Sequence, residues 1–93
     1  MAWVKVEGKD QGDVRVYAAS TCGWCKKTRA LLEELGVAYQ YDYVDLETGA
    51  ERESLLEEMT KWNPQRSVPV VVFNGTECIL GFQPDKIKEA LGL

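Results

Sequence analysis

The chain has 93 residues, with 11 Lys plus Arg against 15 Asp plus Glu, so its formal charge is −4, and 45% of its residues are hydrophobic. This length and composition predict one small globular domain over residues 1–93. The pI of about 4.8 argues against a nucleic-acid-binding domain, for which pI values above about 9 are typical. The longest apolar stretch, at 68–73, is far shorter than the roughly 20 residues of a membrane-spanning helix. Residues 1–7 lack the basic flank, apolar block and cleavage site of a secretion signal, so we expect a cytoplasmic protein. We also expect a monomer with no membrane partner.

Hydrophobic periodicity and turn residues divide the chain into strands and helices. Alternating β-branched residues predict strands, and apolar residues spaced three to four apart predict helices. In chain order the predicted elements are a strand at 14–18, a helix at 22–35 ended by Gly36, a strand at 37–46, a helix at 50–62, two strands at 70–73 and 77–80, and a helix at 84–91. The order βαβαββα predicts an α/β fold in a single domain.

Three local patterns add detail to this order. Residues 3–6 alternate weakly and could form an extra edge strand, followed by a turn up to residue 13. Asn74-Gly75 supplies the positive φ values of a tight turn and predicts a hairpin. The predicted core contains the row of Tyr39, Tyr41 and Tyr43 and the apolar stripe of the helix at 50–62, whose glutamates are expected to face water.

Cys22-Gly23-Trp24-Cys25 places two thiols three residues apart, where a strand ends and a helix begins. Positions i and i+3 share a helix face, so the two sulfurs can close a small disulfide loop. Cys22 lies at the helix N-terminus, where unpaired N–H groups stabilise a thiolate, and Lys26 and Lys27 add positive charge. We therefore expect Cys22 to be the nucleophile and the more covered Cys25 to be the resolving thiol.

Other roles for the cysteines have weaker support. A metal site usually needs four ligands of the Cys and His type, whereas the chain has three Cys and no His, so no metal site within one chain is predicted. The absence of His also excludes Cys-His and Ser-His catalysis. Cys78 alternates with Ile79 in a predicted strand, which favours a packed thiol over a redox role. Trp24 either contacts a partner or covers the start of the helix.

Over essentially all of residues 14–91 the sequence resembles the glutaredoxin-like branch of the thioredoxin superfamily, and three motifs carry the resemblance. They are Thr21-Cys22-Gly23-Trp24-Cys25, then Ser67-Val68-Pro69 before a Val-rich strand, and Gly81-Phe82-Gln83-Pro84-Asp85-Lys86-Ile87 before the last helix. The resemblance implies a thioredoxin fold with a four-stranded mixed sheet flanked by helices. It also implies a thiol-disulfide oxidoreductase with Cys22 and Cys25 as nucleophilic and resolving thiols and without a bound cofactor.

The resemblance further implies a substrate-binding surface beside the dithiol. The residues that match it are Thr21, Trp24, Ser67, Val68, Pro69, Gly81 and Phe82. Pro69 matches a cis proline of the family, and a cis bond would leave the Val68 backbone free to pair with an extended substrate peptide.

The departures from dithiol glutaredoxins bear on the reductant. Ala19 and Phe82 stand where those proteins have a lysine and a polar residue that grip the charged ends of glutathione. The Gly-Phe-Gln-Pro-Asp stretch is closest in motif to NrdH-redoxins, although Gln83 replaces the usual arginine and the insertion at 50–62 lengthens the second helix. This resemblance implies a flavoprotein thioredoxin reductase as electron donor and a disulfide-containing protein substrate such as ribonucleotide reductase. A glutaredoxin using glutathione or another small thiol, and a dimeric iron-sulfur cluster carrier, are the competing hypotheses.

Overall fold

Five strands pair side by side in the computed structural model, which describes residues 3–93. In chain order the elements are β1 (Val4–Val6), β2 (Val14–Ala18), α1 (Gly23–Glu34), β3 (Tyr39–Tyr43), the 3-10 turn η1 (Val44–Leu46), α2 (Gly49–Trp62), β4 (Val70–Phe73), β5 (Glu77–Leu80) and α3 (Pro84–Ala90). The predicted order βαβαββα is thus confirmed from β2 to α3.

The sheet has the strand order β1-β3-β2-β4-β5, in which β2 and β3 are parallel and the other neighbours antiparallel. The sheet has five strands rather than the predicted four, because the possible extra edge strand at residues 3–6 forms as β1 and pairs with the outer edge of β3 in the register Val4↔Tyr41. The ring of Trp3 anchors this segment by packing edge-on against Tyr17, with 5.1 Å between ring centroids. Gly8 allows the chain to pass the end of α1, since a Cβ there would lie 2.6 Å from the Val37 backbone.

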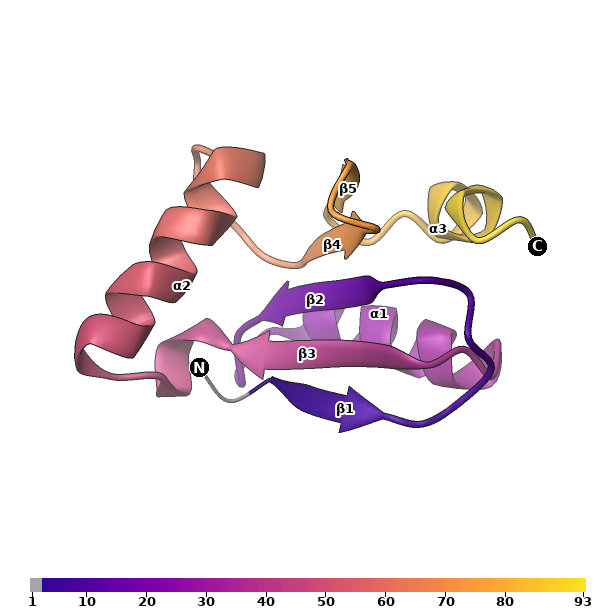
Figure 1. The fold of residues 1–93 in the computed structure, drawn as a ribbon, viewed down its shortest axis with the longest axis horizontal. Helices are drawn as coiled ribbons and strands as arrows, with labels where there is room; N and C mark the ends of the chain where they lie inside the picture. The colour runs from indigo at the N-terminus through magenta and orange to yellow at the C-terminus, as the bar shows by residue number, and fades with distance from the viewer. Residues whose placement is uncertain (1–2) are drawn as a thin grey trace.

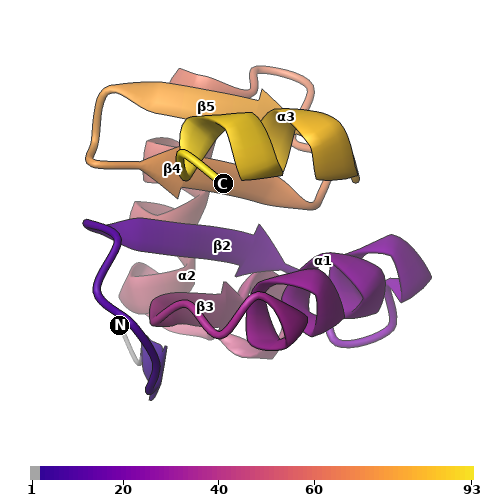
Figure 2. The same ribbon diagram turned by 90° about the vertical axis from the view of Figure 1, so that its right-hand side faces the viewer.

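Helices cover both faces of the sheet (Figure 1). Figure 2 shows α1 and α3 on the near side of the sheet and α2 on the far side. The first core cluster joins Leu32 of α1 and Ile87 of α3 to Val16 and Val71 of the central strands. The second joins Leu55 and Met59 of α2 to the opposite faces of the same strands. β4 is buried along its whole length because it lies between these two clusters.

Two predicted segments differ at their ends from the observed elements. The strand expected at 37–46 stops at Tyr43, and residues 44–46 form η1, because the chain turns there toward α2 on the opposite face. The helix expected from Cys22 begins at Gly23, with Cys22 as its N-cap in an extended conformation. The predicted hairpin is confirmed, with φ values of 54° at Asn74 and 67° at Gly75.

The tyrosine row predicted on one face of β3 lies beneath α1. Successive rings are 6.1 and 5.2 Å apart, from Tyr39 to Tyr41 and from Tyr41 to Tyr43. The Arg29 guanidinium donates to the hydroxyls of Tyr39 and Tyr43 at 3.1 and 2.6 Å, and its central carbon lies 3.6 Å from the centroid of the Tyr41 ring. Hydrogen bonds and a cation-π contact therefore fix α1 to β3.

The register brings four chain segments to one end of the sheet. Ala18 pairs with Tyr43 at the carboxyl ends of the parallel strands, and Tyr17 pairs with Val70 at the start of β4. Val70 in turn pairs with Leu80 at the end of β5. The segments after β2, β3 and β5 and the segment before β4 therefore meet there, which is where the predicted site residues lie. In the described part of the chain, no helix is long and apolar enough to cross a membrane.

Candidate active site

The two thiols of the Cys-x-x-Cys motif lie at the first turn of α1. Cys22 is the N-cap, and its Sγ accepts a hydrogen bond from the backbone N–H of Cys25 at 3.2 Å. The Cys22 N–H donates to the carbonyl of Ala19 at 3.1 Å, which closes the turn between β2 and the helix. The N-cap sulfur thus occupies the place where a helix stabilises negative charge, as the sequence predicts.

The environments of the two thiols differ. Cys22 is partly exposed, whereas Cys25 is 1% exposed and belongs to the core cluster beneath α1. Burial, and then a hydrogen bond with Cys22, raise the pKa of the Cys25 thiol to about 12. The Cys25 thiol is therefore protonated at neutral pH, and Cys22 is the more exposed of the two cysteines.

The Lys27 side chain lies over the exposed ring of Trp24. The Lys27 ammonium lies 4.6 Å from the centroid of the Trp24 ring, in a cation-π contact. Trp24 is 58% exposed and stacks on Phe82, with 5.8 Å between ring centroids and 28° between ring planes. The sequence left open whether Trp24 contacts a partner or covers the start of the helix, and in the structure its ring is largely exposed and stacked on Phe82.

A small hollow of about 250 Å³ lies beside this aromatic pair. It is lined by Trp24, Val68, Pro69, Gly81 and Phe82. The Val68-Pro69 peptide bond is cis, as the resemblance implied, and the Gly81 N–H donates to the Pro69 carbonyl at 2.9 Å. Five of the seven residues predicted to bind substrate are thus brought together from three separate segments.

The other two predicted substrate-binding residues are not among those that line the hollow. Thr21 is exposed and immediately precedes Cys22. The Asn63 amide donates to the Ser67 carbonyl at 3.0 Å and to the Ser67 hydroxyl at 2.8 Å. Ser67 therefore fixes the loop before Pro69 to the end of α2, and its hydroxyl is already engaged within the protein.

Cys78 lies apart from the redox pair. It packs against the α2 cluster, whereas Cys25 packs against the α1 and α3 cluster on the opposite face of the sheet. Its thiol lies 3.9 Å from the Trp62 carbonyl oxygen, within hydrogen-bond range for sulfur. This packing agrees with the structural role predicted for Cys78.

The sequence reasoning missed one polar contact at the site. The Ser20 N–H donates to Asp45 Oδ1 at 2.8 Å, and the Ser20 hydroxyl donates to Asp45 Oδ2. This pair ties the turn before Cys22 to η1. A serine before the first cysteine and an aspartate near the end of the second predicted strand were the available signals, since both lie where parallel strands end at the same edge.

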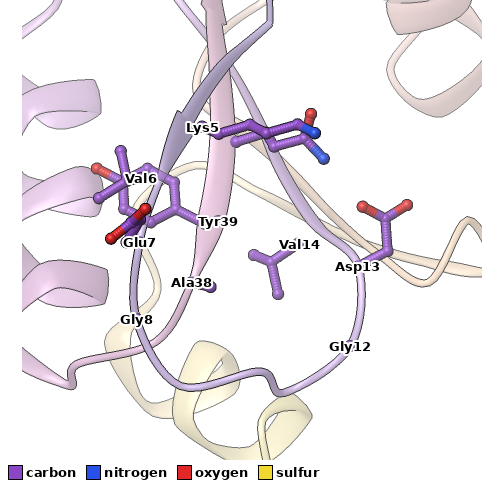
Figure 3. Close-up of a pocket in the computed structure, with 10 residues that line it drawn as sticks. Lys5, Val6, Glu7, Gly8, Gly12, Asp13, Val14, Ala38 and Tyr39 are labelled. Carbon is purple, nitrogen blue, oxygen red and sulfur yellow. The ribbon is translucent and has the colours of Figure 1, made fainter.

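A larger hollow of about 510 Å³ lies near the start of β2, away from the end of the sheet that carries the dithiol (Figure 3). Figure 3 shows it bordered by β1, the loop up to Asp13 and the starts of β2 and β3. Lys5, Glu7 and Asp13 give it charges of both signs, and no predicted site residue lines it. Among residues 3–93 no three Cys, Asp or Glu side chains are placed to hold a metal ion.

Comparison with known proteins links this geometry to one family. The glutaredoxin family model matches residues 14–78. The solved glutaredoxin of Methanosarcina mazei Go1 is 44% identical, with a TM-score of 0.92 over 98% of this chain and 88% of that one. The methanoredoxin of Methanosarcina acetivorans is 41% identical, with a TM-score of 0.89 over 92% and 90%. A glutaredoxin-like 8.6 kDa protein of the rubredoxin operon of Clostridium pasteurianum is 31% identical over 84% of this chain and 96% of its own length. The predicted thioredoxin fold is confirmed by these structures.

Proposed function

Because the chain belongs to the glutaredoxin family, we propose that it reduces disulfide bonds of protein substrates through Cys22 and Cys25. The observation that carries this proposal is the difference between the two thiols. One sulfur is accessible at a helix N-terminus, and the other is buried and protonated one turn away.

The reaction has two thiol-disulfide exchanges. The Cys22 thiolate attacks one sulfur of the substrate disulfide, forms a mixed disulfide and expels the second substrate sulfur as a thiolate. Cys25 then gives up its proton and attacks Cys22 Sγ, which releases the first substrate sulfur. Two electrons pass to the substrate, whose sulfurs end as thiols once both are protonated, and the protein ends with a Cys22–Cys25 disulfide.

The position of Cys25 favours the second exchange. Its backbone N–H already contacts Cys22 Sγ at 3.2 Å, so the attacking thiol is tethered next to the bond that it must break. Such tethering gives effective concentrations far above those of free thiols in solution. Proximity therefore compensates for the high pKa that burial imposes on Cys25.

The hollow beside the dithiol supports a protein substrate. Trp24 and Phe82 offer an apolar surface next to Cys22, and the backbone before Pro69 runs along the hollow they border. An extended substrate segment can place one apolar side chain in this hollow while its disulfide faces Cys22.

We propose a flavoprotein thioredoxin reductase, rather than glutathione, as the electron donor. Ala19 offers no cation, and the stacked Phe82 ring offers no hydrogen bond to a glutathione carboxylate or amine. Each charge-assisted hydrogen bond contributes about 1.5–3 kcal/mol, and about 1.4 kcal/mol is a tenfold change in affinity, so two lost contacts weaken glutathione binding at least tenfold.

The test is reduction of insulin disulfides, coupled either to NADPH and thioredoxin reductase or to glutathione and glutathione reductase. We expect the unmodified protein to be faster with thioredoxin reductase, and the double variant Ala19→Lys and Phe82→Ser to shift toward glutathione. Brisk turnover with glutathione and none with thioredoxin reductases would contradict the proposed donor while leaving the dithiol chemistry intact.

Variants of the thiols test the chemistry itself. Cys22→Ser is expected to be inactive, and Cys25→Ser to accumulate a mixed disulfide with the substrate that dithiothreitol releases. Cys78→Ala is the matched control, because it removes a thiol on the opposite side of the sheet. A Cys22→Ser protein that still reduces insulin would contradict the assignment of the nucleophile.

A further inference from the structure

The turn that carries Cys22 is held to the end of β3 by one carboxylate. Asp45 accepts hydrogen bonds from both the backbone N–H and the hydroxyl of Ser20, which is 25 residues distant in the chain. On the other side of Ser20, the Cys22 N–H bonds to the Ala19 carbonyl at 3.1 Å. These contacts fix the backbone on either side of Ser20 just before the N-cap sulfur.

The charge of Asp45 is secured by the same contacts. The two hydrogen bonds from Ser20 hold the pKa of the Asp45 carboxyl below its usual range, so it is ionised at neutral pH. Its negative charge also adds to the larger effects of burial and of the Cys22 hydrogen bond in raising the pKa of Cys25. Asp45 is thus connected to the dithiol chiefly through the turn that Ser20 and Cys22 share.

We propose that Asp45 is a positioning residue of the dithiol, which clamps Ser20 and thereby fixes the turn from which the Cys22 sulfur attacks. The inference rests on the proposed function, because it concerns the same sulfur. Asp45 is not a catalytic residue, since the turn and Ser20 separate its carboxylate from the reacting atoms.

The exposure of the clamp distinguishes this role from a general stabilising one. Asp45 is exposed and Ser20 partly exposed, so water competes for these contacts and reduces the about 1.5–3 kcal/mol that a hydrogen bond to a charged group can contribute to folding. A displacement of about 1 Å at a reacting group can lower a rate by up to about 100-fold. Loss of the clamp should therefore affect the reactivity of Cys22 more than the stability of the fold.

The experiment measures the attack of Cys22 on two probes, iodoacetamide and bis(2-hydroxyethyl) disulfide. Both probes are uncharged, so removing the negative charge of Asp45 does not change their electrostatic attraction to the protein. The variants are Asp45→Ala, Asp45→Asn, Ser20→Ala and Ser20→Thr. Asp10→Asn is the matched control, because Asp10 also accepts a loop N–H, from Gly12 at 2.9 Å, but before β2 at the other end of the sheet. Circular dichroism on each variant reports its folded fraction at the assay temperature.

We expect Asp45→Ala to slow both reactions at least about fivefold without loss of folded protein. Asp45→Asn, which keeps one acceptor oxygen, should lie between Asp45→Ala and the unmodified protein. Ser20→Ala should be slowed, while Ser20→Thr, which restores the hydroxyl, should match the unmodified protein. Asp10→Asn should also be unchanged.

Rates within twofold of the unmodified protein for folded Asp45→Ala would overturn the proposal, and so would equal slowing by Asp10→Asn. If Asp45→Ala does not fold, the comparison of Ser20→Ala with Ser20→Thr decides in the same way. A protein whose Cys22 reacts with both probes but that reduces no insulin disulfide would contradict the proposed function, and the role of Asp45 would still be decided by the probe rates.

Discussion

The contrast between the two thiols predicts their order of alkylation. When the reduced protein is treated with iodoacetamide at pH 8, we expect label on Cys22 and almost none on Cys25. Cys25 is 1% exposed, and burial together with the Cys22 hydrogen bond raises the pKa of its thiol to about 12. Only thiolates react, so Cys25 is protected because its thiol stays protonated as well as because it is buried.

The size of this protection follows from the pKa. At pH 8 a thiol of pKa about 12 is ionised in about one molecule in 10,000, against about one in four for an unperturbed cysteine of pKa about 8.5. The more basic thiolate is intrinsically more reactive, by about 40-fold for a Brønsted slope near 0.45. The net effect is labelling of Cys25 about 60-fold slower than in the unfolded chain, before any steric protection is added.

The assay is a time course of alkylation followed by peptide mass mapping, run on folded protein and on protein in guanidinium chloride. The unfolded sample supplies the reference rate for the same cysteine with the same neighbours. Labelling of Cys25 before Cys22, or at a rate close to its rate in the unfolded chain, would refute the assignment of the two roles.

Three further predictions concern stability. Cys78→Ala should lower the free energy of unfolding by about 1 kcal/mol and leave insulin reduction within twofold, and lost turnover in a folded variant would show that the third thiol takes part. Burial raises the pKa values of Tyr17, Tyr39 and Cys25 to about 12, so the folded state keeps protons that the unfolded chain loses. Denaturant titrations should therefore show the free energy of unfolding falling by several kcal/mol as the pH rises from about 9 to 12, and constant stability over that range would contradict the burial argument. Arg29→Ala should lower the free energy of unfolding by about 2 kcal/mol, because it removes two hydrogen bonds and a cation-π contact. Arg29→Lys should recover less than half of this, because one ammonium cannot both stack on a ring and bond two hydroxyls, and full recovery by lysine would show that charge alone suffices.

Local chemistry explains which parts of the fold could be predicted from the sequence. Asn74-Gly75 predicts its own turn because both residues accept positive φ, and Gly36 ends α1 for the same reason. The dithiol could likewise be placed at a helix start, since the strand before it and the helical spacing after it are written in adjacent residues. These predictions depend on neighbours in the chain and not on the rest of the fold.

The features that sequence reasoning missed depend on distant partners. An extra edge strand at residues 3–6 was one possibility from the sequence, but β1 has only three residues, two of them exposed, and so short a pattern does not show that it pairs with β3. The Ser20–Asp45 clamp joins residues that become neighbours only when β2 and β3 lie parallel. The location of the site could be predicted from motifs, whereas the contacts that hold it in place could only be found from the arrangement of the strands.

The pairing of β2 with β4 brings together the two chain segments that form the site. Cys22 follows β2, whereas Pro69 and Phe82 border the segment that runs from β4 into α3. A chain cut in the loop after α2 would leave the reactive sulfur on one fragment and most of the substrate hollow on the other. Neither fragment would hold a complete site, so turnover would return only when the fragments reassemble through the pairing of β2 with β4. Disulfide reduction by the mixed fragments would then report their association, as in a split-protein reporter.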